Sequence, residues 1–234
     1  MLRNHLIIAL RNIRRQPVFA AINIAGLAVG LAACWLLGVF VLHERSYDRF
    51  LPDADRICSV SLDLKMGDQE GRTTNTPPPL GPRLLTDFPE IELAARTFYL
   101  QESTVRLEKP GQAPLTFTES YAFAADTSFL ELFHFPMLQG DAATALDQRG
   151  NLVLSQSAAE KYFGKNASPL GQVLFINDRP FTVSGVAKTL PSNSTVQFDF
   201  LVPMADFKVV ERFFMVVGLV AGGHLGAAAR TRKP

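Results

Sequence analysis

The sequence predicts a mixed α+β domain that follows one membrane-spanning helix. The first observation is residues 17–42, PVFAAINIAGLAVGLAACWLLGVFVL, a run without Asp, Glu, Lys, Arg or His. The second is that the rest of the chain intermixes short strand-like and short helix-like segments, without the regular βαβ spacing of a doubly wound sheet. The chain has 234 residues, which is room for one anchor and one domain of ordinary size.

Residues 17–42 are long and apolar enough to cross a bilayer. As an α-helix the run would reach about 37 Å at ~1.5 Å per residue, and the hydrocarbon core of a bilayer is ~30 Å thick. The alternative is a buried core helix of a water-soluble protein. Such a helix keeps a polar stripe and this run has none, so we expect a transmembrane helix.

The charges that flank this helix predict its orientation. Four basic residues precede it: Arg3, Arg11, Arg14 and Arg15. The mixed-charge segment HERSYDRF, residues 43–50, follows it. Because Lys and Arg concentrate on the cytoplasmic side of spanning helices, we expect a cytoplasmic N-terminus in a bacterial inner membrane and a periplasmic region after residue 42.

Two kinds of cleaved signal compete with an uncleaved anchor. A secretory signal peptide has an apolar region of roughly 7–15 residues and a small-residue cleavage site, whereas this run is longer and no such site closes it. Residues 31–34, LAAC, have the form of a lipobox in which Cys34 would be lipidated. The apolar run continues past Cys34, however, where a mature lipoprotein turns polar. We expect the uncleaved anchor, and N-terminal sequencing or intact mass separates the three outcomes.

Small residues lie four positions apart within the helix. Gly26 and Gly30 form a G-x-x-x-G pair, and Ala21 and Ala25 precede them. Such pairs let a second helix approach closely in lipid, and they also arise by chance in spans rich in Gly and Ala. Helix packing through these residues and plain composition are therefore both open readings.

Residues 1–16 precede the helix, and residues 2–15, LRNHLIIALRNIRR, place apolar side chains at helical spacing. The arginines fall largely elsewhere on this helix, which is typical of a basic amphipathic helix on a membrane surface. The segment is either a contact for a cytoplasmic partner subunit or a simple topology anchor.

The region from residue 43 to residue 206 reads as short strands and helices separated by turns. Strands are predicted from period-two alternation and from Thr, Phe, Tyr and Val content, at 58–64, 96–100, 104–107, 115–123, 151–154, 173–176, 181–186 and 197–202. Short helices are predicted at 80–88, 129–133, 142–146 and 156–163. Residues 67–76 read as a loop.

Local signals mark several of these boundaries. Ser155 is the expected N-cap of the helix over 156–163, and Gly164 is expected to end that helix in a left-handed conformation. Residues 126–128, DTS, can cap the helix over 129–133. Residues 177–180, NDRP, predict a hairpin between two strands.

The segment 207–234 carries a second apolar run, residues 213–229, FFMVVGLVAGGHLGAAA, followed by RTRKP. A second spanning helix would place those terminal basic residues in the cytoplasm, although the run is at the short limit for crossing a bilayer. The alternatives are a soluble or surface-lying tail, or the aberrant end of a truncated gene product.

Composition and motifs exclude several functions. The formal net charge is +1, so no strongly basic face indicates a nucleic-acid partner. We expect both cysteines, Cys34 and Cys58, to be unpaired, and no Cys/His cluster indicates a metal. P-loop, G-x-S-x-G and H-E-x-x-H motifs are absent, so the chain is not expected to bind ATP or to be an enzyme.

Scattered titratable residues give no enzyme site. The four histidines are read as surface or interfacial residues: His5, His43, His134 and His224. Asp126, Asp141 and Asp199 are candidate acids, and caps and turns account for the first two.

Several stretches together resemble a known family. ALRNIRRQPVFAAINIAGLAVGLAAC and SYDRFLPDADRI resemble the N-terminus of MacB/FtsX-type permease subunits of ABC transporters. Three later stretches resemble the MacB-like periplasmic core domain: AADTSFLELFHFPMLQGD, LVLSQSAAEKYFGKNASPLGQ and FTVSGVAKTLPSNSTVQFDFLVP. The resemblance extends over residues 2–204, although Cys58 stands where we expect an aromatic residue.

The resemblance implies a cytoplasmic segment 1–16, a transmembrane helix 17–42, an incomplete MacB-like periplasmic core over 43–206 and a C-terminal segment 207–234. It implies a non-catalytic permease subunit, or a truncated remnant, in which a separate cytoplasmic ABC ATPase binds ATP and drives periplasmic domain movement or efflux. Such subunits contact membrane lipid and form homodimers or heterodimers. The family continues with three further helices that residues 207–234 do not resemble. A membrane-anchored periplasmic binding or adaptor module without transport activity is therefore the alternative.

Overall fold

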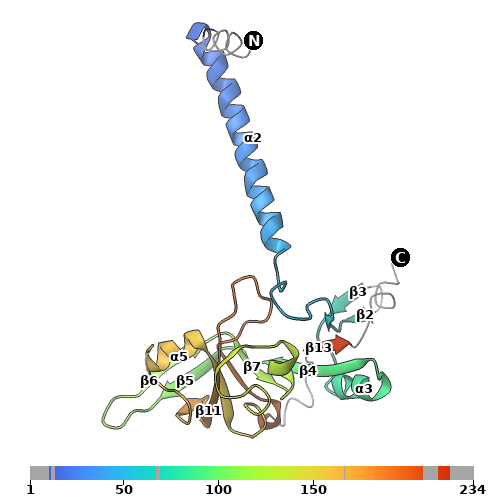
Figure 1. The fold of residues 1–234 in the computed structure, drawn as a ribbon, viewed down its shortest axis with the longest axis vertical. Coiled ribbons are helices and arrows are strands. Elements are labelled where there is room, and N and C mark those ends of the chain that lie inside the picture. The colour runs from blue at the N-terminus through green and yellow to red at the C-terminus, as the bar shows by residue number, and fades with distance from the viewer. Residues whose placement is uncertain (1–10, 12–13, 67–68, 166, 208–215, 222–234) are drawn as a thin grey trace. The chain divides into compact units, whose positions relative to one another are not determined.

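The computed structural model describes residues 11, 14–66, 69–165, 167–207 and 216–221 (Figure 1). These residues divide into two compact units, Met1–Tyr47 and Asp48–Pro234, which are described separately below.

The first unit contains the helix α2, Pro17–Glu44, which ends two residues beyond the predicted range. Its 28 residues correspond to about 42 Å of helix. The mean hydropathy of its most apolar stretch is 2.4, and none of its residues is buried. Among the described residues it is the one helix that is long and apolar enough to span a membrane, so the predicted N-terminal apolar helix is confirmed.

The second unit combines strands with short helices. The strands on its N-terminal side are β1 Ile57–Ser59, β2 Leu62–Met66, β3 Gln69–Thr73, β4 Ile91–Tyr99, β5 Ser103–Leu107, β6 Leu115–Glu119 and β7 Ala122–Ala125. The later strands are β8 Met137–Gln139, β9 Asn151–Ser155, β10 Val173–Ile176, β11 Arg179–Ala187, β12 Phe200–Pro203 and β13 Val216–Ala221. The helices are α3 Leu80–Asp87, α4 Phe129–Leu132, α5 Gln156–Phe163 and the 3-10 turn η1 Met204–Asp206.

Most of these strands form one mixed sheet. Its described order is β1-β13-β4-β7-β12-β9-β11-β10-β5-β6, and β8 pairs with β11 beside this path. The pairs β9–β11 and β7–β12 are parallel, and the other pairs are antiparallel. Because strands and short helices mix without a repeated βαβ unit, the predicted α+β class is confirmed.

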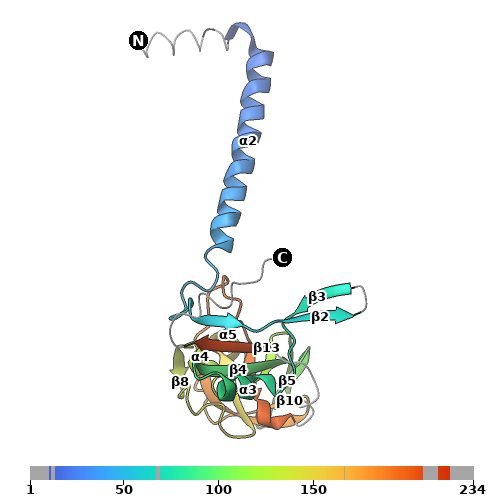
Figure 2. The ribbon, with the colours of Figure 1, turned by 90° about the vertical axis from the view of Figure 1, so that its right-hand side faces the viewer.

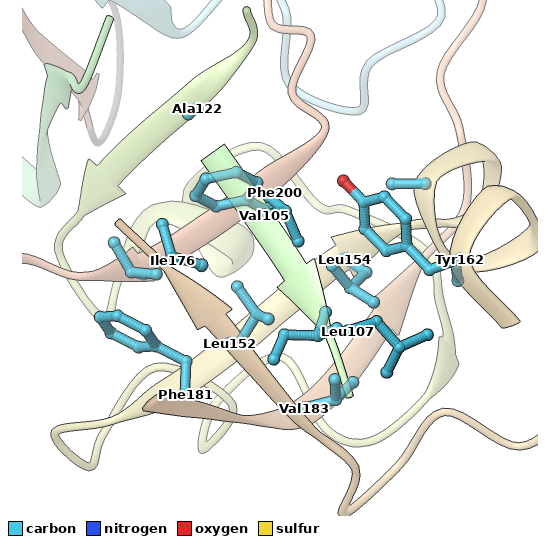
Figure 3. Close-up of a cluster of buried hydrophobic side chains, with 14 of the residues drawn as sticks. Val105, Leu107, Ala122, Leu152, Leu154, Tyr162, Ile176, Phe181, Val183 and Phe200 are labelled. Carbon is cyan, nitrogen blue, oxygen red and sulfur yellow. The ribbon is translucent and has the colours of Figure 1, made fainter. Parts of the chain in front are cut away.

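The centre of the sheet is buried on both faces. In β9, Leu152 and Leu154 belong to one hydrophobic cluster and Val153 to the other. In β12, Phe200 belongs to the first cluster and Leu201 to the second. Figure 3 shows the first cluster, where Tyr162 of α5 lies near Leu154. Two covered faces explain why these strands read as continuous apolar runs rather than as alternating ones.

One hairpin of the domain was predicted from the sequence, and another was not. β10 and β11 are joined by Asn177 and Asp178, both with positive φ (47° and 64°), as a two-residue hairpin turn requires. This hairpin was predicted. β2 and β3 form a separate two-stranded sheet, which Figure 2 shows beside the main sheet.

The prediction of a loop over 67–76 was wrong for residues 69–73, which form β3. Opposite charges face each other across β2 and β3, with Arg72 Nε 2.7 Å from Asp63 Oδ1 and Lys65 Nζ 2.9 Å from Glu70 Oε1. These four side chains are exposed, so the apolar alternation that marks a half-buried strand is missing from β3.

The cap of α5 was predicted correctly. Ser155 Oγ accepts a hydrogen bond from Ala158 N at 3.1 Å. Gly164 ends the helix with φ 89° as expected, but its ψ of 161° belongs to an extended region open essentially to glycine, not to the left-handed helical one. The cap predicted for 129–133 was wrong, because Ser128 Oγ donates to Ala94 O at 2.7 Å and no side chain caps α4.

Two other predicted segments are broken in the structure. The predicted strand 115–123 divides into β6 and β7, separated by Ser120 and Tyr121. The predicted strand 58–64 likewise divides into β1 and β2. Residues 142–146, predicted as a helix, form successive turns rather than an assigned helix.

The described part of the C-terminal apolar run is a strand. Within the segment 213–229, for which a second spanning helix was one reading, residues 216–221 form β13 between β1 and β4. Val is favoured in strands, and both β1 and β4 form backbone hydrogen bonds with this segment. These six residues are therefore not helical. Residues 213–215 and 222–229 lie outside the described residues.

Candidate functional site: a clasp and an apolar pocket

The residues predicted to matter in the membrane lie on or before α2. Gly26 and Gly30 are exposed, and a Cβ built at either position meets no atom within 4 Å. Arg11, Arg14 and Arg15 are exposed as well, whereas Arg3 lies outside the described residues. Both roles, helix packing and topology, stay predictions.

The three candidate acids stand apart and have structural partners. Both carboxylate oxygens of Asp126 accept hydrogen bonds from Arg96, at 2.8 and 2.9 Å. The hydrogen bonds to Asp126, and to a smaller extent its charge, raise the pKa of Arg96. Asp141 Oδ1 accepts from Ala143 N at 3.1 Å, which closes a turn.

Asp199 belongs to a partly buried polar cluster. Glu119, buried on β6, accepts hydrogen bonds from Lys161 Nζ at 2.6 Å and from Tyr162 Oη at 2.7 Å. Burial, and the nearby Glu119 charge, raise the pKa of Asp199, although the hydrogen bond from Tyr121 N opposes the shift. The pKa of Tyr162 is also raised by burial and by Glu119. This cluster ties α5 to the edge strand β6.

Asp48 fastens the start of the domain to a loop almost 150 residues later. Its carboxylate accepts hydrogen bonds from Thr195 N at 2.9 Å, from Ser194 Oγ at 3.3 Å and from Thr195 Oγ1. Its own backbone N donates to Asn193 O at 3.1 Å. We call Asp48 and residues 193–195 the clasp.

The backbone of Asp48 is shaped for this role. Its φ is 55°, a left-handed conformation that Asp tolerates better than most residues. Its carbonyl accepts from Leu51 N at 3.1 Å, so a tight turn follows, and the Leu51 side chain is only 7% exposed. The segment that follows α2 therefore begins with a fixed turn and a buried anchor.

An apolar pocket lies next to the clasp, with a volume of about 560 Å³. Its apolar walls include Leu51, Ile57, Phe123, Phe129, Phe133 and Phe198. Its polar lining includes Asp48, Ser59, Thr97, Thr195 and Gln197. Among the described residues that line it, none is Lys, Arg or His.

The two cysteines are free thiols, and one of them lines this pocket. Burial raises the pKa of Cys58, so its thiol is less reactive at neutral pH than an ordinary one. Cys34 lies in α2. Within the described residues, no group of three His, Cys, Asp or Glu side chains could hold a metal.

Sequence reasoning missed the clasp and the pocket. Residues 43–50 were read only as a mixed-charge segment after the helix, and residues 191–194 fall between two predicted strands. Nothing in either segment indicates that they meet. The one available signal is that Ser194 and Thr195 carry hydroxyl groups, which can donate hydrogen bonds to a carboxylate.

An apolar helix long enough to span a membrane, followed by a mixed α+β domain, is the arrangement of a membrane-anchored domain. A solved domain of a protein described as a permease, from Porphyromonas gingivalis, matches with a TM-score of 0.65 and 25% identity, over 77% of this chain and 79% of that one. The periplasmic region of MacB from Actinobacillus actinomycetemcomitans matches with a TM-score of 0.54 and 16% identity, over 74% and 78%. At that identity the second match shows the fold alone.

Curated relatives match over a shorter stretch. Pyoverdine export ATP-binding/permease proteins PvdT from Pseudomonas syringae pv. tomato and Pseudomonas fluorescens are 32% and 33% identical over 83 and 70 residues. These stretches cover 32% and 29% of this chain, but only 13% and 11% of the relatives.

The model of the MacB-like periplasmic core domain matches residues 20–231, most of the chain. The chain belongs to this family, and it carries the periplasmic core domain of MacB-like ABC transporter permeases. The resemblance seen in the sequence is thereby confirmed.

Proposed function

We propose that this chain is a non-catalytic permease subunit that couples ATP hydrolysis by a partner ATPase to movement of its periplasmic domain. In this proposal α2 crosses the inner membrane, residues 1–16 face the cytoplasm and contact the ATPase, and residues 43–206 lie in the periplasm. ATP is bound by the partner. A second permease copy, alike or different, packs against α2 through Gly26 and Gly30.

The observation that carries the proposal is the short connection between α2 and the clasp. Glu44 ends the helix, and Asp48, four residues later, is already held by hydrogen bonds from residues 194 and 195. A displacement of the helix end therefore pulls on a fixed point of the core domain rather than on a long slack linker. The names of the curated relatives, which are export proteins, support an efflux role.

Co-purification tests the partnership. The tagged full chain would be extracted from membranes of its own host with a mild detergent, and co-purifying proteins would be identified by mass spectrometry. We expect an ATPase with a P-loop. Reversing the charges of Arg11, Arg14 and Arg15 to Glu should lose the ATPase while the chain stays in the membrane. Because these arginines are also expected to set the orientation of α2, the accessibility of Lys109→Cys to an impermeant maleimide must be the same in this variant as in the wild-type background.

The matched control reverses basic residues beyond the other end of α2, Arg45→Glu and Arg49→Glu. This control should retain the ATPase, because these residues are proposed to lie outside the cytoplasm. Recovery of the wild-type chain without any ATPase would contradict the permease proposal and support the anchored adaptor module instead.

A further inference from the structure

We propose that the apolar pocket beside the clasp binds the acyl chain of an amphiphile at the membrane surface. The volume and the lining carry the proposal. A cavity of about 560 Å³ lies within the ~300–1,000 Å³ range of small-molecule sites, which are lined mainly by apolar and aromatic side chains. Phe123, Phe129, Phe133 and Phe198 give this pocket four aromatic walls.

The polar lining favours a tail over a charged headgroup. Asp48 carries the one carboxylate among the described lining residues, and it accepts hydrogen bonds from Thr195 and Ser194. No described lining residue is cationic, so none of them would form an ion pair with a phosphate or carboxylate. An acyl chain needs no polar partner and can be buried against these apolar and aromatic side chains.

Several lining residues follow α2 closely in the sequence, which points to the bilayer as the source of the acyl chain. Leu51, Ala54 and Ile57 follow the end of α2 by 7, 10 and 13 residues, counted from Glu44. Seven residues reach at most ~25 Å, at ~3.3–3.6 Å per residue. If α2 spans the bilayer, Leu51 is tethered close to its surface, where acyl chains are concentrated.

This inference needs α2 in the membrane, but it does not need an ATPase partner or transport. The test uses the full chain with Cys34→Ser, in lipid nanodiscs, and a palmitate that carries a photoreactive diazirine in mid-chain. After illumination, adducts are mapped by mass spectrometry. We expect adducts on peptides that contain Leu51–Cys58 or Phe129–Phe133, and we expect excess unlabelled palmitate to remove them.

A paired set of variants separates the pocket from the lipid-facing helix. Ala54→Phe fills the pocket and should lower adducts on these peptides at least five-fold, while adducts on α2 stay constant. Ala143→Phe makes the same change at an exposed turn residue and should leave every adduct unchanged. Melting temperatures confirm that both variants fold.

A second readout is the rate at which Cys58 reacts with a maleimide at alkaline pH. Bound palmitate should slow that rate several-fold in the parent chain. The proposal is overturned if adducts map only to α2, if Ala54→Phe and Ala143→Phe give the same pocket adducts, or if palmitate leaves the Cys58 rate unchanged. None of these outcomes bears on whether an ATPase co-purifies.

Discussion

Asp48 is the residue whose substitution should disturb the domain most locally. Asp48→Ala removes the acceptor for Thr195 and Ser194 and places Ala at a positive φ, so we expect a loss of about 2 kcal/mol in unfolding free energy. Asp48→Asn keeps an acceptor and tolerates this backbone, so it should lose about half as much. Denaturant unfolding of the full chain, followed by circular dichroism, measures both.

The control for this prediction is Asp55→Ala, at an exposed position in the same segment. It should change stability by no more than about 0.5 kcal/mol. Equal losses for Asp48→Ala and Asp55→Ala would show that the clasp contributes nothing specific.

Asp199 should make stability depend on pH in a defined direction. Its folded pKa is raised, chiefly by burial. Its contribution is therefore fully present below the unfolded pKa of about 3.9 and is lost as pH rises through the folded value. Asp199→Asn keeps an acceptor for Tyr121 N but has no charge, so it should raise the melting temperature at pH 7.5.

The gain from Asp199→Asn should shrink at pH 4 and vanish at about pH 3 and below, because Asp199 is then protonated in both the folded and the unfolded state. Exposed Asp147→Asn serves as the control and should show no such pH dependence. A gain of the same size at pH 4 and pH 7.5 would refute the electrostatic cause.

At the scale of elements, Gly140 sets how β8 lies on β11. Its φ is 80°, and a Cβ there would lie 2.4 Å from the backbone oxygen of Ser184. We expect Gly140→Ala to cost about 3 kcal/mol or more, from left-handed strain plus a backbone clash. Thermal unfolding checks this prediction.

Gly150→Ala isolates the strain from the clash. Its φ is 79°, but its Cβ would meet no atom within 4 Å, so the cost should be only about 1–2 kcal/mol. Similar losses for the two variants would mean that the close approach to Ser184 has little effect.

Elements with a strong local signal could be predicted, and elements defined by distant partners could not. The α5 cap at Ser155 and the Asn177-Asp178 turn depend on residues within a few positions. β3 pairs only with β2 and carries exposed charges. Its sequence therefore lacks the alternation of apolar and polar residues that would identify a strand. β13 is a strand because β1 and β4 flank it, and those partners lie about 160 and 125 residues away.

At the scale of the whole molecule, the membrane anchor could be predicted from the sequence, but the clasp and the pocket could not. An apolar run of 26 residues predicts the anchor by itself, because a bilayer requires only length and apolarity. The clasp and the pocket join the segment around 48–58 to α4 with its C-cap, residues 129–133, and to the loop around 195–198. Such contacts follow from the tertiary fold, which neither segment encodes alone.

The central claim is that α2 crosses the membrane and places the core domain on the side opposite the N-terminus. Its most direct test is cysteine accessibility in bacterial spheroplasts, in a Cys34→Ser, Cys58→Ser background. Lys109→Cys, at an exposed turn between β5 and β6, reports on the domain, and Arg11→Cys reports on the N-terminal side. We predict that a membrane-impermeant maleimide labels Lys109→Cys in intact spheroplasts and labels Arg11→Cys only after permeabilisation. Labelling in the reverse order, or of both variants only after permeabilisation, would contradict the account.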